Sequence, residues 1–228
     1  MKIRLRCLPG YAGHVPEPVL ARRSLPEWLR TMPPSAESTV LGAQVRTVKQ
    51  CLPFVEAMQT GLIFRLAADL TLKDGTFSWN SGLPVHPVAR LSRAPIGVHV
   101  PEQATGAPFA DPHHFIVKFT NHWTVSLPEG FGLLVGHPYN REDLPFRTLW
   151  GVVERFDDGF VHFPALWTDH AVNVTVPRGT PVAQAVPIPL EPLDLDIAEM
   201  DDGELARHID LEDRIQSEPG HYRRTRRG

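Results

Sequence analysis

GVVERFDDGFVHFPALWTDHAVNVTVPRGTPVAQAVPI, residues 151–188, gives the clearest indication of the fold in this sequence. Short apolar runs in it are separated by turn residues at Asp157–Gly159 and Pro177–Gly179. The order is a strand, an acidic turn, a strand, a polar loop, a strand, a glycine turn and a final strand. Short strands at this spacing are typical of an all-β domain. The stretch therefore predicts a small β-barrel whose acidic turn faces a pocket.

The rest of the chain extends this pattern. Lys2–Leu8 alternates apolar and basic residues, which predicts a half-buried strand. Further strands are expected over Phe115–Phe119, Trp123–Leu127 and Phe131–Gly136. The 23 prolines are scattered, and proline is excluded from helix interiors and central strands, so many short elements are expected.

Two short helices are expected to pack on the β domain. One is predicted near Leu25–Met32, and the other lies in Thr47–Thr60, where apolar residues recur at helical spacing. Pro53 begins or bends the second helix, and Gly61 ends it. We expect a mainly β fold, a barrel or jelly roll over residues 1–195.

Residues 196–228 differ in character. Asp196–Glu218 is strongly acidic and carries leucines and isoleucines at helical spacing, which predicts an amphipathic helix docked on the body or on a neighbour. The final residues, HYRRTRRG, form a basic tail that we expect to be mobile.

Composition narrows the function classes. The net charge of −3 provides no global field for nucleic acid or an anionic membrane surface. Cys7 and Cys51 are too few for a disulfide framework or a cysteine-based zinc site. We find no apolar run long enough for a signal peptide or a membrane span, so a cytoplasmic protein is expected.

Two resemblances follow from particular motifs. WTVSLPEGFGLLVGHPYNR together with GVVERFDDGF and PRGTPVAQAVPI resembles the second half of the barrel of trimeric dUTPases and dCTP deaminases, over residues 115–188. TVKQCLPF, FTNHWTVSLPEG and GHPYNREDLPF resemble an uncharacterised family of bacterial and phage proteins, which implies no activity. The first resemblance implies a dUTPase-like β-clip fold and a homotrimer with pockets between subunits.

The dUTPase resemblance also implies site residues. Glu154 and Asp157 take the two acidic positions of the catalytic turn, and Gln184 matches the glutamine of the last motif. His137, Asn140 and Arg141 lie where the family has its phosphate-contacting segment. The glutamate is one methylene longer than the family's aspartate, which displaces the carboxylate by about an ångström. These residues would form a pocket for a small anionic ligand.

Histidines suggest a second interpretation. His113, His114, His122 and His137 flank consecutive predicted strands, and Asp111 or Glu154 could join them around Fe(II) or another divalent metal. The histidine spacing of cupins and oxygenases is absent, and Ala183 stands where the cupin turn has its ligand.

Three functions therefore stay open at this point. The first is binding of a small anionic ligand, such as a nucleotide, with hydrolysis by Glu154 or Asp157. The second is a metal-dependent jelly-roll enzyme. The third is a non-catalytic interaction module whose acidic arm binds a partner.

Overall fold

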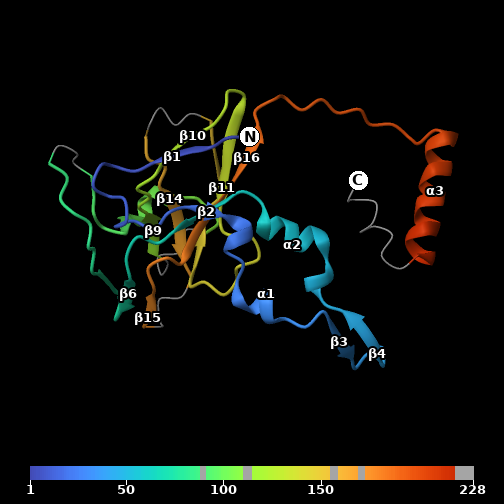
Figure 1. The fold of residues 1–228 in the computed structure, drawn as a ribbon, viewed down its shortest axis with the longest axis horizontal. Helices are drawn as coiled ribbons and strands as arrows, with labels where there is room; N and C mark the ends of the chain where they lie inside the picture. The colour runs from blue at the N-terminus through green and yellow to red at the C-terminus, as the bar shows by residue number, and fades with distance from the viewer. Residues whose placement is uncertain (88–90, 110–114, 155–158, 169–172, 219–228) are drawn as a thin grey trace. The chain divides into compact units, whose positions relative to one another are not determined.

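A computed structural model describes residues 1–87, 91–109, 115–154, 159–168 and 173–218. Within them the chain is mainly β, as the sequence predicts (Figure 1). The chain divides into two units, Met1–Leu190 and Glu191–Gly228. The boundary lies five residues before the one expected from the sequence, at residue 195.

The described strands are short and carry the following bounds. They are β1 (Arg4–Arg6), β2 (Val19–Leu20), β3 (Ser35–Ser38), β4 (Ala43–Arg46), β5 (Leu62–Arg65), β6 (Leu70–Lys73), β7 (Thr76–Trp79), β8 (Ile96–His99), β9 (Phe115–Phe119), β10 (Thr124–Ser126), β11 (Phe131–Gly136), β12 (Phe146–Thr148), β13 (Gly151–Val153), β14 (Phe163–Trp167), β15 (Val174–Val176) and β16 (Pro181–Pro189).

Two larger sheets form the first unit. One has the strand order β13-β11-β16-β5-β2 and the other β12-β14-β9-β8, and the pairs between neighbouring strands are antiparallel. β11 and β16 run side by side, from Phe131 opposite Pro189 to Gly136 opposite Gln184. Figure 1 shows these two strands as the long yellow-green and orange pair.

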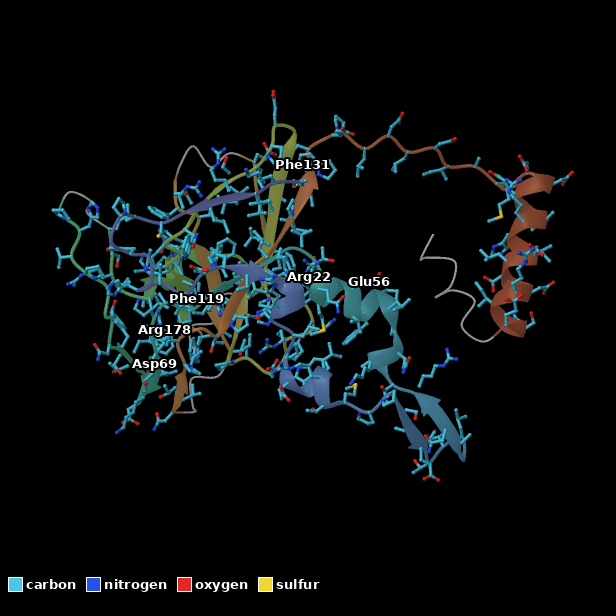
Figure 2. The ribbon with its side chains drawn as sticks, in the orientation of Figure 1. Arg22, Glu56, Asp69, Phe119, Phe131 and Arg178 are labelled. Carbon is cyan, nitrogen blue, oxygen red and sulfur yellow. The ribbon has the colours of Figure 1, made fainter. Side chains whose placement is uncertain are left out.

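The two sheets share one hydrophobic core. Phe64 of β5 contacts Phe163 of β14, with ring centroids 5.0 Å apart. Phe119, which Figure 2 labels within the body, is 1% exposed and packs edge-on against Phe146. Burial of these rings removes apolar surface from water, which is the main stabilising contribution in such a domain.

Three small sheets complete the description. They have the orders β15-β6-β7, β3-β4 and β1-β10. The expected barrel or jelly roll is thus only partly confirmed. In the described residues the strands form five separate sheets rather than a closed barrel, because pairing breaks where prolines and turns interrupt the strands.

An arginine at the predicted glycine turn ties distant segments together. The backbone N–H of Arg178 donates to Asp69 Oδ1 at 2.6 Å, and its guanidinium donates to the carbonyls of Ala67 and His14. Figure 2 shows the Arg178 and Asp69 side chains next to each other.

Both predicted helices of the first unit are present. α1 spans Glu27–Thr31, and α2 spans Leu52–Gln59 with Pro53 in its first turn. The 3₁₀ turns η1 (Ala21–Arg23), η2 (Val48–Gln50) and η3 (Pro101–Ala104) lie elsewhere along the chain. Gly61 ends α2 with φ +78°, and a Cβ there would lie 2.1 Å from the Ala185 carbonyl oxygen. Only glycine fits this position.

The second unit contains α3, Asp202–Ser217. Asp201 caps its first turn, and the Glu204 side chain returns the hydrogen bond to the Asp201 N–H. None of its residues is buried. No helix in the described part of the chain is long and apolar enough to cross a membrane.

Candidate functional site

His137 lies just after β11 and is held by two backbone groups. Its Nδ1 accepts from the Thr148 N–H at 3.2 Å, which leaves Nε2–H to donate to the Arg141 carbonyl at 2.8 Å. Burial lowers the pKa of His137. The hydrogen bond to the Arg141 carbonyl favours the protonated ring and so acts in the opposite direction, but burial has the larger effect. Both ring nitrogens are therefore used within the fold.

Gln184 is also fully used. The side chain is 1% exposed, and its amide nitrogen donates to the carbonyls of Ala57 and Thr60 at 2.9 and 2.6 Å. Its oxygen accepts from the Tyr139 N–H at 3.0 Å. These bonds join the end of α2 to the chain after β11. We call His137, Tyr139, Thr148 and Gln184 the β11 corner.

Arg141 is paired next to this corner. Its guanidinium donates to both carboxylate oxygens of Asp143, at 2.8 and 3.0 Å. Partial burial acts to raise the pKa of Asp143, but the hydrogen bonds and charge of Arg141 outweigh it and hold that pKa below its usual value. Asn140 is exposed in a left-handed turn with φ 57°. The Arg141 guanidinium, which was expected to bind an anionic ligand, is thus already paired with a carboxylate.

Glu154 lies away from the corner. Val153 pairs with Leu133, so Glu154 is level with Gly132, five residues before His137 on β11. At the rise per residue of a β-strand, the backbones of Glu154 and His137 are therefore about 17 Å apart along the strand direction. Glu154 is exposed, and Asp157 lies outside the described residues. The structure thus brings His137, Arg141 and Gln184 together and leaves Glu154 at the other end of β11.

The histidines expected to bind metal are only partly described. His113 and His114 lie outside the described residues. In the part that is described, no three histidine, cysteine or acidic side chains gather as a metal site would require. His122 is 4% exposed and lies near His162.

A pocket opens beside these two histidines. Its volume is about 210 Å³. It lies where β9 ends and the antiparallel strand β14 begins, because Phe119 pairs with Phe163. We call it the His162 pocket, and its described lining consists of Leu91, Ser92, Gly97, Lys118, Thr120, Asn121, His122, Phe160 and His162.

Asn121 fixes the floor of the pocket. Its side-chain amide donates to the carbonyls of Trp123 and Val161 at 2.7 and 3.1 Å, and its oxygen accepts from the Trp123 N–H at 2.9 Å. Its own backbone N–H donates to His162 Nδ1 at 3.1 Å. Since Nδ1 of the neutral His162 ring accepts, Nε2 carries the proton and can donate to a ligand.

His122 carries a polar atom without a partner. Its Nε2 is buried and forms no hydrogen bond. Burial, and then the neighbouring His162, lower the pKa of His122 to about 4. An unpartnered buried polar atom costs about 1–3 kcal/mol, so it is rare unless a ligand or a water meets it.

The electrostatics of the pocket favour an anion. Burial, and then the positive charge of Lys118, lower the pKa of His162. None of the described lining residues is acidic. Leu91 and Phe160 supply apolar surface. The pocket therefore suits a small ligand with an anionic group and an apolar part.

Sequence reasoning missed this pocket, although a signal was present. Lys118 is the only charge in the otherwise apolar run Phe115–Phe119, so it had to emerge on the outer face. His162 directly precedes the apolar run of β14. The pairing of β9 with β14, which brings them together, is a long-range contact.

Comparisons with known proteins give little support for an assignment. No protein-family model matches the chain, and no curated protein matches it. The solved structures with some similarity include a mutant dUTPase from phage phi11 of S. aureus, with a TM-score of 0.27 and 16% sequence identity over 39% of this chain and 74% of that chain. At this level the likeness does not bear on the activity.

Proposed function

We propose that the protein binds a small anionic ligand in the His162 pocket. The observation that carries the proposal is that His122, whose buried Nε2 has no partner, lines the same cavity as Lys118 and His162. Buried polar groups are normally satisfied, so a ligand that accepts or donates there would remove an existing cost.

The ligand class follows from the lining. Lys118 supplies a positive charge, and His162 Nε2–H supplies a directed donor. A carboxylate or phosphate accepts from both, and charge-assisted bonds of this kind are the strong ones. The volume of about 210 Å³ limits the bound part of the ligand to a small molecule.

A thermal-shift titration tests the proposal directly. The probes are inorganic phosphate, benzoate and deoxyuridine monophosphate, and each is tested with wild-type protein and with Lys118→Met. A probe at a hundred times its Kd stabilises by about 2.7 kcal/mol, which is readily measured. We expect the shift in wild type and its loss in Lys118→Met.

Two further variants make the result specific. Lys73→Met removes the same charge from an exposed position in β6, and it should keep the full shift. Arg141→Ala tests the pocket that the sequence analysis expected. Loss of binding in Arg141→Ala but not in Lys118→Met would move the site to the β11 corner. No shift with any of the anions would reject the proposal.

The finer expectations stay predictions. They are the dUTPase-like β-clip, the homotrimer and hydrolysis of a nucleotide by Glu154 or Asp157. Release of pyrophosphate from dUTP, lost in Glu154→Gln, would support the enzymatic interpretation. A shift with Zn²⁺ or Ni²⁺ that disappears in His162→Ala would favour metal binding by the imidazoles.

A further inference from the structure

We propose that residues 193–197 of one copy of the protein pair, as an added strand, with the open edge of β1 in a second copy. This inference is independent of the His162 pocket. It rests on an unpaired strand edge and on an exposed segment with the complementary pattern of charge and hydrophobicity.

β1 has an unoccupied side. Among the described strands it pairs only with β10, from Arg4 opposite Ser126 to Arg6 opposite Thr124. An open groove of about 530 Å³ is lined by Lys2–Arg6. The Leu5 carbonyl accepts from the Arg6 guanidinium at 2.7 Å, so an added strand that bonds to this carbonyl displaces that side chain. An open edge of this kind is a template for another strand.

The two faces of β1 differ. Ile3 and Leu5 are half-buried and pack against the main hydrophobic core, whereas Lys2, Arg4 and Arg6 are exposed. A strand that added to this edge would need apolar residues on the first face and acidic residues on the second.

Residues 193–197 have that pattern. Their sequence is LDLDI, and the segment has no regular structure in the described chain. Leu193, Leu195 and Ile197 are 92%, 76% and 87% exposed. Such exposure of three successive alternate apolar residues is costly in water and marks an interaction segment.

The two patterns fit residue by residue. Residues directly opposite each other in a β-pair point to the same face of the sheet. In an antiparallel register with Ile3 opposite Ile197, Leu5 lies opposite Leu195. The same register sets Arg4 opposite Asp196 and Arg6 opposite Asp194. Every pair is then either apolar with apolar or basic with acidic.

Charge also explains why the partner is the acidic segment. A second β1 at this edge would set arginines and lysine against each other, which is destabilising. Residues 191–200 contain four acidic residues and no basic one. The edge is thus complementary to the acidic segment and not to another β1.

A charge swap tests the pairing in the full chain. We expect wild type to associate at micromolar concentration in sedimentation velocity. Asp194→Lys with Asp196→Lys should raise the Kd of association at least about tenfold, and so should Arg4→Glu with Arg6→Glu. Mixing these two variants should restore association, because each then offers the edge or segment that complements the other.

The control variant changes the charge of the chain but keeps the alternating pattern of residues 193–197. Glu191→Lys with Glu199→Lys makes the same net change outside residues 193–197 and should leave association within about threefold of wild type. A wild type that stays monomeric up to about 200 µM, two orders of magnitude above a micromolar Kd, would overturn the proposal. So would unchanged association of the Asp194/Asp196 variant.

Discussion

The β11 corner and the His162 pocket contain the same kinds of side chain in opposite states. At the corner, both nitrogens of His137 and both the amide nitrogen and the oxygen of Gln184 bond to backbone groups. At the pocket, His122 Nε2 is buried without a partner, and His162 lines the cavity together with Lys118.

The difference separates structural polar groups from available ones. A buried group that the fold satisfies contributes to stability, and a ligand could reach it only by breaking existing bonds. A buried group that the fold leaves unsatisfied raises the free energy of the empty protein, and a ligand can recover that cost. Burial and residue type alone do not distinguish the two.

Removal of Gln184 should give the largest effect on folding. Gln184→Leu removes, in a buried site, the hydrogen bonds that the amide makes to the Ala57 and Thr60 carbonyls and to the Tyr139 N–H. We expect the free energy of unfolding to fall by about 3–5 kcal/mol. Urea denaturation measures it, and Gln44→Leu in the exposed β3-β4 hairpin should change it by less than about 0.5 kcal/mol.

A small effect of Gln184→Leu would contradict the structural role of the β11 corner. It would mean that water replaces the amide at the three backbone groups. The corner would then be open enough to serve as a binding site, as the sequence analysis expected.

The fold was easier to predict than the site, for a physical reason. Local sequence patterns encode the strands of residues 115–136 and 160–188, through alternation of apolar residues and the positions of prolines. They also encode the end of helix α2, at Gly61, where no other residue fits. The site depends on which strands pair. The register of β13 on β11 moves Glu154 away from His137, and the pairing of β9 with β14 unites Lys118 with His162.

Partner bonds were likewise invisible in the sequence. The sequence predicts that Gln184 binds a ligand, whereas in the structure its side chain makes three hydrogen bonds to backbone groups 45 to 127 positions away. Asp143 neutralises Arg141 from only two positions away, yet the motif gives no sign of whether the fork points to it or to a ligand.

The pH dependence of folding should report His122. Its pKa is about 4 in the folded protein and near 6.5 when unfolded, so the unfolded chain binds more protons between these values. Stability is therefore full above about pH 6.5 and is lost as the pH falls towards 4. The loss assigned to this group is at most about 3 kcal/mol.

His122→Leu isolates that contribution. At pH 7 the variant should lie within about 1 kcal/mol of wild type, because the substitution removes an unpartnered nitrogen. At pH 4.5 it should be the more stable protein by urea denaturation. The lowered pKa of His137 remains in both proteins and cancels in the difference. His162 interacts electrostatically with His122, so its titration is part of the difference that is measured. Parallel decline of the two proteins would show that the His122 ring is hydrated.

The smallest effect is expected from Asp143→Asn, which frees Arg141 without changing size. The ion pair is partly exposed at Asp143, 43%, so its loss should lower stability by less than about 1 kcal/mol. If the His162 pocket is the anion site, the shift by phosphate or benzoate stays as in wild type. A larger anion shift in Asp143→Asn would show that the Arg141 fork binds the ligand once its carboxylate is removed. Asp143, next to the β11 corner, would then compete with the anion for Arg141 rather than act as a purely structural group.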